Sequence, residues 1–134
     1  MTACGLWLAR GRLIAVVVDD TGRASPAISA CLDDDARWGL LEHVEATHSL
    51  DIDLVLAEEL SRHDNIGRLA LQRGLPVWLA PQRLVDAISA AAGMATGPPA
   101  RRAAMIARLM RVPAWRGHLR RLELNADRRQ LPLL

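Results

Sequence analysis

The first third of the chain contains three short apolar segments that are separated by turn residues. Arg10-Gly11 follows the first segment, and Asp19-Asp20-Thr21-Gly22 follows the second, which is continuously apolar and rich in β-branched residues. Such runs are typical of strands covered on both faces, and the short connections predict an antiparallel meander. Two more apolar runs come later, so we expect five strands, over residues 4–9, 12–18, 27–32, 53–57 and 75–80.

Helices are predicted where apolar residues recur at a spacing of three or four. Asp33, Asp34 and Asp35 supply an N-cap and first-turn acids for a helix that should end near His48. Because this role accounts for the three carboxylates, we do not expect them to form a metal site. Further helices are expected over residues 62–73, 81–91 and 100–111, with another helical turn or two within 114–124.

This order of elements, β-β-β-α-β-α-β-α followed by C-terminal helices, predicts an α/β fold with one five-stranded mixed sheet. The fourth and fifth strands are each followed by a helix, which favours right-handed parallel crossovers. A chain of 134 residues that is 51% hydrophobic can bury a core without disulfides or metals. We expect a core over residues 1–97, an arginine-rich helical part over 98–124 that packs on the core, and a flexible tail over 125–134.

Composition argues against several classes of protein. The longest apolar runs fall well short of 18 residues, and no basic region leads into an apolar stretch at the start, so we expect neither a membrane span nor a signal peptide. Cys4 and Cys31 lie in apolar surroundings, which predicts two buried, reduced thiols and a cytoplasmic location. The spacing of Cys and His residues does not resemble a zinc site.

Charge is distributed unevenly along the chain, and every basic residue other than histidine is an arginine. Residues 1–97 contain eight arginines and 13 acidic residues, a formal net charge of −5, whereas residues 98–134 contain nine arginines and two acidic residues, a net charge of +7. This asymmetry predicts either a surface for a polyanion such as DNA or a solvated basic helix face. The candidate phosphate-binding residues are Arg101, Arg102, Arg108, Arg111, Arg116, Arg120 and Arg121.

Several short motifs occur in a characteristic order. Leu54-Val55-Leu56-Ala57-Glu58 is followed by Gly74-Leu75-Pro76-Val77 and then by Pro81-Gln82-Arg83-Leu84-Val85, while Gly5-Leu6-Trp7 lies in the first strand. Taken together over roughly residues 4–110, this order resembles the ribonuclease H-like superfamily, in particular RuvC-type resolvases and DEDD insertion-sequence transposases. The resemblance implies a fold around one mixed sheet and a nuclease that holds two divalent metals with about four carboxylates.

The acidic residues that the resemblance requires are mostly missing. Trp7 stands where the family has its central Asp, and an indole cannot bind magnesium, which prefers oxygen ligands. Residues 96–107, where further acids should occur, contain none. Glu58, or Glu59 if the gap is placed differently, is the acid that remains. We therefore expect no bound metal, with magnesium only if other acids take over, and we expect Glu58 to pair with an arginine.

The C-terminus carries a second short motif. Gln130-Leu131-Pro132-Leu133-Leu134 resembles the pentapeptide with which bacterial polymerases and repair proteins dock on the sliding clamp. Gln130, Leu131 and Leu133 match that pattern, and Leu134 replaces its aromatic residue. A mobile tail can place such apolar anchors in a preformed pocket.

Three functions follow from these observations. The first is a non-catalytic ribonuclease H-like domain from DNA recombination, a mobile element or DNA repair, which binds DNA or a protein through its arginine-rich part. The second is a magnesium-dependent endonuclease with a rearranged acid set that includes Glu58 or Glu59. The third is a protein-interaction module that docks on the sliding clamp. A small-molecule enzyme has no support, because neither a Gly-rich phosphate loop nor a Gly-x-Ser-x-Gly elbow occurs.

Overall fold

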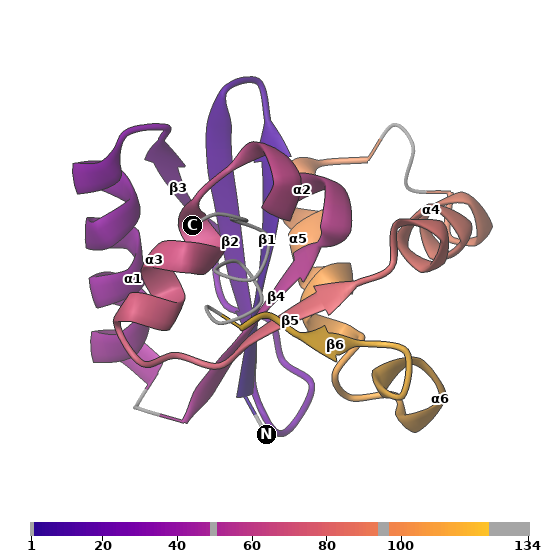
Figure 1. Cartoon of the computed structure of the whole chain (residues 1–134). Helices are drawn as coiled ribbons and strands as arrows, with labels where there is room; N and C mark the ends of the chain where they lie inside the picture. The colour runs from indigo at the N-terminus through magenta and orange to yellow at the C-terminus, as the bar shows by residue number, and fades with distance from the viewer. Residues whose placement is uncertain (1, 49–50, 94–96, 124–134) are drawn as a thin grey trace, which may run out of the picture.

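The computed structural model of the chain describes residues 2–48, 51–93 and 97–123. Within them one mixed sheet has the strand order β3-β2-β1-β4-β5-β6, with helices on both faces (Figure 1). The strands are β1 Thr2–Ala9, β2 Arg12–Val18, β3 Ile28–Cys31, β4 Ile52–Ala57, β5 Val77–Ala80 and β6 Arg120–Arg121. The helices are α1 Asp34–His48, α2 Glu58–His63, α3 Ile66–Gln72, α4 Gln82–Ala91, α5 Pro99–Arg108 and α6 Pro113–Arg116.

Strand pairing confirms the predicted α/β class. β1, β2 and β3 form an antiparallel meander. β4 pairs parallel with β1, and β5 pairs parallel with β4. The predicted helical turns within 114–124 are correct only for α6, because Arg120–Arg121 forms an additional edge strand antiparallel to β5. Leu119 and Leu122 flank two exposed arginines, a pattern that is too short to distinguish a helix from a strand.

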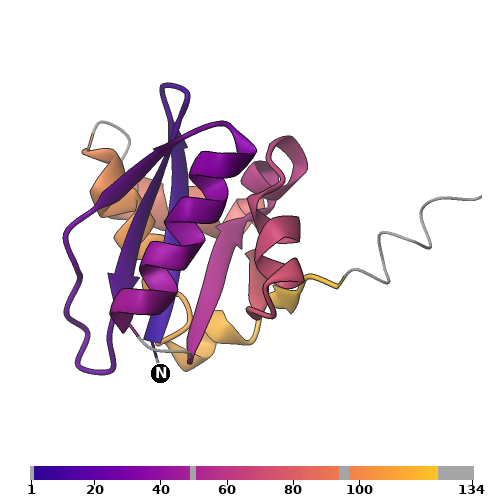
Figure 2. The same cartoon turned by 90° about the vertical axis from the view of Figure 1, so that its left-hand side faces the viewer.

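Two apolar layers lie on opposite faces of the sheet, because alternate side chains of a strand point to opposite sides. One layer lies under α1 and α3, and the other under α4 and α5 (Figure 2). The first is built around Leu6, Leu13, Leu41, Leu54, Leu56 and Ile66. The second is built around Val18, Val55, Val85, Ile106, Leu109 and Met110. The predicted inward positions of the 100–111 helix, which include Met105, are all buried.

Helix α5 lies directly on the central strand β1 because the facing residues are small. A Cβ atom at Gly5 would overlap the carbonyl oxygen of Ala103 and would lie 2.5 Å from the backbone nitrogen of Ala107. Gly5, Ala103 and Ala107 are all buried. This close approach fixes the position of α5, and with it the arginines that α5 carries.

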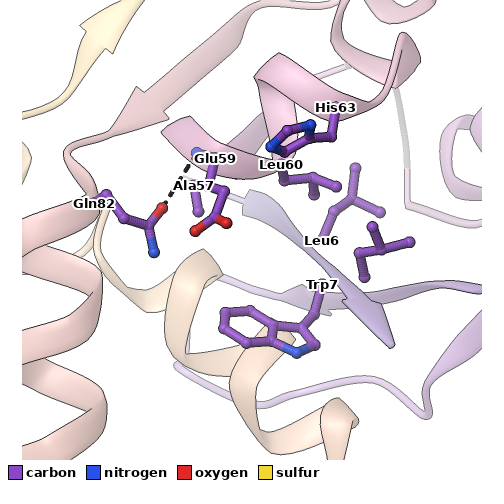
Figure 3. A pocket seen from close by; sticks show the side chains of 8 residues that line it. Leu6, Trp7, Ala57, Glu59, Leu60, His63 and Gln82 are labelled. Carbon is purple, nitrogen blue, oxygen red and sulfur yellow. Dashed lines mark hydrogen bonds between the residues drawn. The ribbon is translucent and has the colours of Figure 1, made fainter. Parts of the chain in front are cut away.

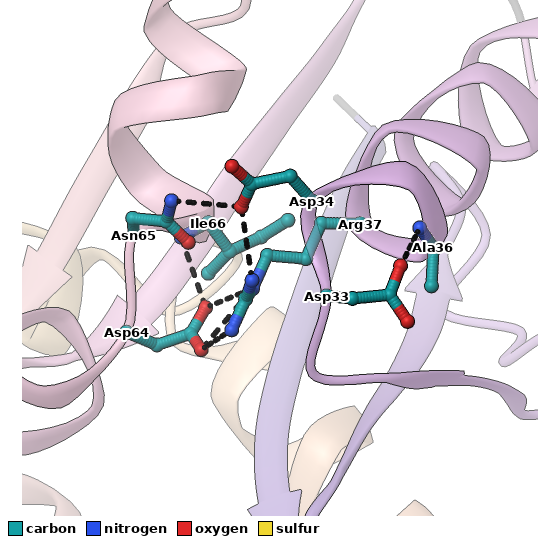
Figure 4. Close-up of polar contacts among 7 residues, drawn as sticks. All are labelled: Asp33, Asp34, Ala36, Arg37, Asp64, Asn65 and Ile66. Atoms are coloured by element: carbon teal, nitrogen blue, oxygen red, sulfur yellow. Dashed lines mark hydrogen bonds and ion pairs between the residues drawn. The ribbon is translucent and has the colours of Figure 1, made fainter.

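The helix expected over residues 62–73 is interrupted at Asp64-Asn65. The Asp64 carboxylate, whose side chain is 3% exposed, accepts a hydrogen bond from the Ile66 backbone N–H at 2.9 Å and is bound by the Arg37 guanidinium of α1 at 2.7 Å (Figure 4). Asp and Asn compete with helical hydrogen bonds in this way, which explains why α2 and α3 are separate helices. The ion pair also ties α1 to the α2–α3 junction.

Two further local predictions have different outcomes. The Asp33 carboxylate accepts a hydrogen bond from the Ala36 N–H at 2.8 Å, which confirms the predicted N-cap. The prediction of two buried cysteines is wrong for Cys31, which is exposed at the end of the short edge strand β3, whereas Cys4 is buried on β1. Burial raises the pKa of the Cys4 thiol to about 12, so this thiol is unreactive. Among the described residues, no helix is long and apolar enough to cross a membrane.

Candidate functional site

The carboxyl end of β1 extends beyond its parallel neighbour β4. Pairing between these two strands ends at Gly5 and Val55, whereas β1 stays paired with β2 as far as Ala9 and Arg12. The strand order also reverses here, because the chain leaves β1 toward β2 on one side and leaves β4 toward β5 on the other. Open α/β sheets bind ligands in the crevice outside the strand ends at such a reversal. This edge is therefore where the fold favours a site.

A cavity of about 300 Å³ opens at this edge, between the end of β1 and helix α2 (Figure 3). Most of its wall is apolar, and its polar groups come from α2 and from the start of α4. The lining residues are Leu6, Trp7, Leu8, Ala57, Glu59, Leu60, His63 and Gln82. The topology thus brings together residues from four separate elements, β1, β4, α2 and α4.

Trp7 forms one wall of the cavity. Its indole is partly buried against the apolar residues of the α5 face, and the guanidinium carbon of Arg102 lies 5.3 Å from the ring centroid. This is the strand end at which the resemblance would require a metal-binding Asp. An indole offers no oxygen ligand, so this position stabilises a cation through its ring instead.

Glu58 points away from the cavity toward α4 and β6. Its Oε1 accepts a hydrogen bond from the Gln82 backbone N–H at 3.0 Å, and its Oε2 lies 3.4 Å from Arg120 Nη2. The expectation that Glu58 pairs with an arginine is confirmed. The Gln82 N–H and, to a smaller extent, Arg120 hold the pKa of Glu58 below its ordinary value, so this carboxylate is ionised and already bound.

Glu59, rather than Glu58, shares the cavity with Trp7. Its backbone N–H donates to Gln82 Oε1 at 3.2 Å, which fixes the start of α2 against α4 (Figure 3). Its carboxylate is exposed and has no hydrogen bond or ion pair in the part of the chain that the structure describes. Gln82 is held in place as well, because its Nε2 donates to Asp86 Oδ1 at 3.0 Å.

The residues at this edge do not fit a two-metal centre. Helix α5 faces β1 with Ala103 and Ala107 and contains no acidic residue. Asp53 lies at the opposite end of β4 and accepts a hydrogen bond from Trp78 Nε1 at 3.2 Å. Over residues 2–48, 51–93 and 97–123, no group of three or more His, Cys, Asp or Glu side chains could hold a metal ion. Glu59 by itself cannot hold two metals.

The seven predicted phosphate-binding arginines are distributed over α5, the segment that follows it, α6 and β6. Six of them are exposed, and Arg102 is partly buried. Arg102 lies near the cavity, whereas Arg108 and Arg111 reach the β2–β3 connection at the other end of α5. There Arg108 donates to the Gly22 carbonyl at 3.5 Å, and Arg111 donates to the Asp19 carbonyl.

Most of these arginines keep an uncompensated charge. Arg101, Arg108, Arg111, Arg116 and Arg121 form no ion pair with a carboxylate in the described residues, and Arg121 instead lies 5.0 Å from the ring centroid of Trp78. Carbonyl and ring contacts orient a guanidinium without neutralising it. The arginines of α5, α6, β6 and the intervening segment are here called the arginine surface. Contacts with carbonyl groups or rings orient Arg108, Arg111 and Arg121 while leaving their charge in place.

The predicted clamp-docking residues, Gln130, Leu131, Leu133 and Leu134, lie outside the described residues. Comparison of the sequence with protein-family models and with curated proteins finds no match.

Among the residues that line the cavity, Glu59 is the predicted site residue, whereas Leu60, His63 and Gln82 are among those that the sequence did not indicate. Leu60 and His63 lie in a segment whose predicted helix started too late, so α2 was not placed at the strand end. Gln82 follows the helix-starting Pro81, which indicated a helix but not what it would contact. The sequence spacing of these residues did not indicate that they meet, because the contact between β1 and α2 depends on the order of strands in the sheet.

Proposed function

We propose that this chain is a non-catalytic ribonuclease H-like domain that binds DNA through its arginine surface, in DNA recombination, a mobile element or DNA repair. The observation that carries the proposal is a set of exposed arginines that have no carboxylate partner in the described residues: Arg101, Arg108, Arg111, Arg116 and Arg121. Arginines in this state neutralise phosphates and release counterions from DNA.

The order of elements supports the ribonuclease H-like part of the proposal. The meander β1–β2–β3 is followed by α1, β4, the α2–α3 pair, β5 and α4, which is the order that the resemblance implies. Trp7 at the end of the central strand, together with the alanines of α5, supports the absence of metal-dependent cleavage. Over the described residues, Glu59 belongs to no group of three or more side chains that could hold a metal ion.

A salt titration of DNA binding tests the proposal. With the full chain, we expect log K for duplex and branched DNA to fall linearly with log salt, with a slope of about −0.9 for each phosphate contacted. Arg101→Gln combined with Arg116→Gln should make the slope shallower by about 2, since each arginine contributes about 1. Neither side chain makes a hydrogen bond or ion pair in the described residues, so the double variant should keep its fold.

Arg10→Gln is the matched control, because Arg10 is an exposed arginine in the β1–β2 turn, outside the arginine surface. It should leave the slope unchanged. Absence of binding at low salt would exclude the proposal. Cleavage of either DNA with magnesium or manganese, if abolished by Glu59→Gln, would favour the nuclease instead.

A further inference from the structure

The cavity at the end of β1 has the composition of a site for a flat, amphipathic ligand. The indole of Trp7 and the side chains of Leu6 and Leu60 form apolar walls, and the carboxylate of Glu59 lies at the rim next to Gln82 (Figure 3). Its volume of about 300 Å³ is enough for a single aromatic heterocycle but not for a folded element of another protein. Pockets of this kind combine apolar walls with a few polar groups that fix orientation.

The carboxylate in the cavity favours a ligand that donates hydrogen bonds. The Glu59 carboxylate accepts only, and it has no partner among the described residues. Both ends of the Gln82 amide are already used, by the Glu59 N–H and by Asp86. A nucleobase with an exocyclic amino group, such as cytosine, presents a flat π-face to an indole and an N–H donor to a carboxylate.

A second cavity, of about 330 Å³, adjoins the first and shares His63 with it. Its lining includes the basic side chains Arg62 and Arg68, whereas the amide of Asn65, which also lines it, donates to Asp34 Oδ1 at 3.1 Å. Asp64 also lines it, but that carboxylate is bound by Arg37. Two arginines in one cavity suit a phosphate group, so the two cavities together match the base and the phosphate of one nucleotide.

We propose that the Trp7 cavity accepts one unpaired nucleobase of a bound DNA, with Trp7 stacking on the base, Glu59 accepting from its amino group, and Arg62 and Arg68 contacting the adjacent phosphate. This inference rests on the proposed function, because the arginine surface supplies the binding to the rest of the DNA. A base that is already unpaired enters without the free-energy cost of leaving a duplex stack. The domain therefore recognises a structural defect or a branch in DNA.

Competition binding between two DNAs tests this inference. One DNA is a fully paired duplex, and the other has the same sequence with a single unpaired cytosine. At fixed low salt, the full chain should bind the bulged DNA about tenfold to hundredfold more tightly, the range expected for one stacked base. In Trp7→Leu this preference should fall to about one. Trp38→Leu is the control, since Trp38 is a partly exposed indole on α1, on the opposite face of the sheet.

Glu59→Gln provides a second and independent test. Glu59 is exposed, so the variant should fold even if Trp7→Leu does not. Loss of the carboxylate should reduce the preference for a bulged cytosine over a bulged thymine, which lacks an amino group. Equal binding of paired and bulged DNA by the unaltered chain would overturn the inference and leave the proposed function standing. Absence of binding to either DNA would overturn both.

Discussion

Gly5 controls how closely helix α5 approaches the central strand. We expect Gly5→Ala to lower the free energy of unfolding by about 3 kcal/mol or more, because the new methyl group would overlap the backbone of α5 and no flexible side chain could move aside. Urea unfolding followed by circular dichroism measures the change. Gly39→Ala in α1 is the matched control: its Cβ meets open space, so a gain of about 0.5–1 kcal/mol is expected. Equal effects of the two substitutions would contradict the close packing.

Glu58 makes the stability of the protein depend on pH. In the folded state its pKa is lowered, first by the Gln82 N–H and second by Arg120. Glu58 therefore stabilises the fold above its unfolded pKa of about 4.5, and this stabilisation is lost as the pH falls through the folded pKa. Glu58→Gln should therefore unfold at a lower temperature than the unaltered chain at about pH 7, and the difference should shrink to zero in acid below the folded pKa. Thermal unfolding of both proteins from about pH 7 down into acid measures this difference in melting temperature. A difference that stays constant with pH would argue against the ionised contact.

At the scale of elements, one buried ion pair joins α1 to the junction of α2 and α3. The Arg37 and Asp64 side chains are 11% and 3% exposed. Asp64→Ala should cost about 3 kcal/mol of unfolding free energy, because it leaves the Arg37 charge buried without its main partner. Asp34→Ala removes a second Arg37 contact, at a carboxylate that is 70% exposed, and should cost less than about 1 kcal/mol. Urea unfolding of both variants measures the two losses in unfolding free energy. Similar losses would contradict the dominant role of Asp64 as the partner of Arg37.

This ion pair also bears on the cavity. Asp64 ends α2 one residue after His63, so the contact with Arg37 sets where α2 stops and where α3 begins. The ion pair between Arg37 of α1 and Asp64 thus helps to position α2, which supplies part of the cavity wall. Stability measurements on Asp64→Ala therefore also report on the support of the proposed base site.

At the scale of the whole molecule, the excess of positive charge is carried by the last part of the chain. Helix α5 packs on β1, and its arginines reach from Trp7, beside Arg102, to the β2–β3 connection, where Arg108 donates to Gly22. Beyond α6, Arg120 and Arg121 carry this charge to the edge of the sheet at β5. Acidic residues among the first 97 pair with arginines of the same part of the chain, as Asp64 does with Arg37 and Glu45 with Arg73. The protein thus separates charge by element, which suits electrostatic attraction of a polyanion.

Much of the fold was predictable because local patterns determined it. Runs of β-branched residues predicted the strands, and Asp33 predicted the start of α1. The spacing of apolar residues in the 100–111 helix predicted its buried face. The strand at Arg120–Arg121 was not predictable, and Asp64-Asn65 gave only a local signal for a helix break, because both features also depend on partners distant in sequence. Arg37 binds Asp64, and β5 pairs with β6.

For the candidate site, the sequence by itself determined which chemistry was absent: Trp7 and the alanines of α5 provide no metal ligands, whatever their positions in space. The tertiary structure decided which residues meet. It placed Glu59 beside Trp7 and brought Glu58 into contact with Gln82 and Arg120. It also formed a cavity where β1 extends beyond its pairing with β4. The physical reason is that side-chain chemistry belongs to each residue, whereas a cavity arises from the order and register of strands, which long-range pairing sets.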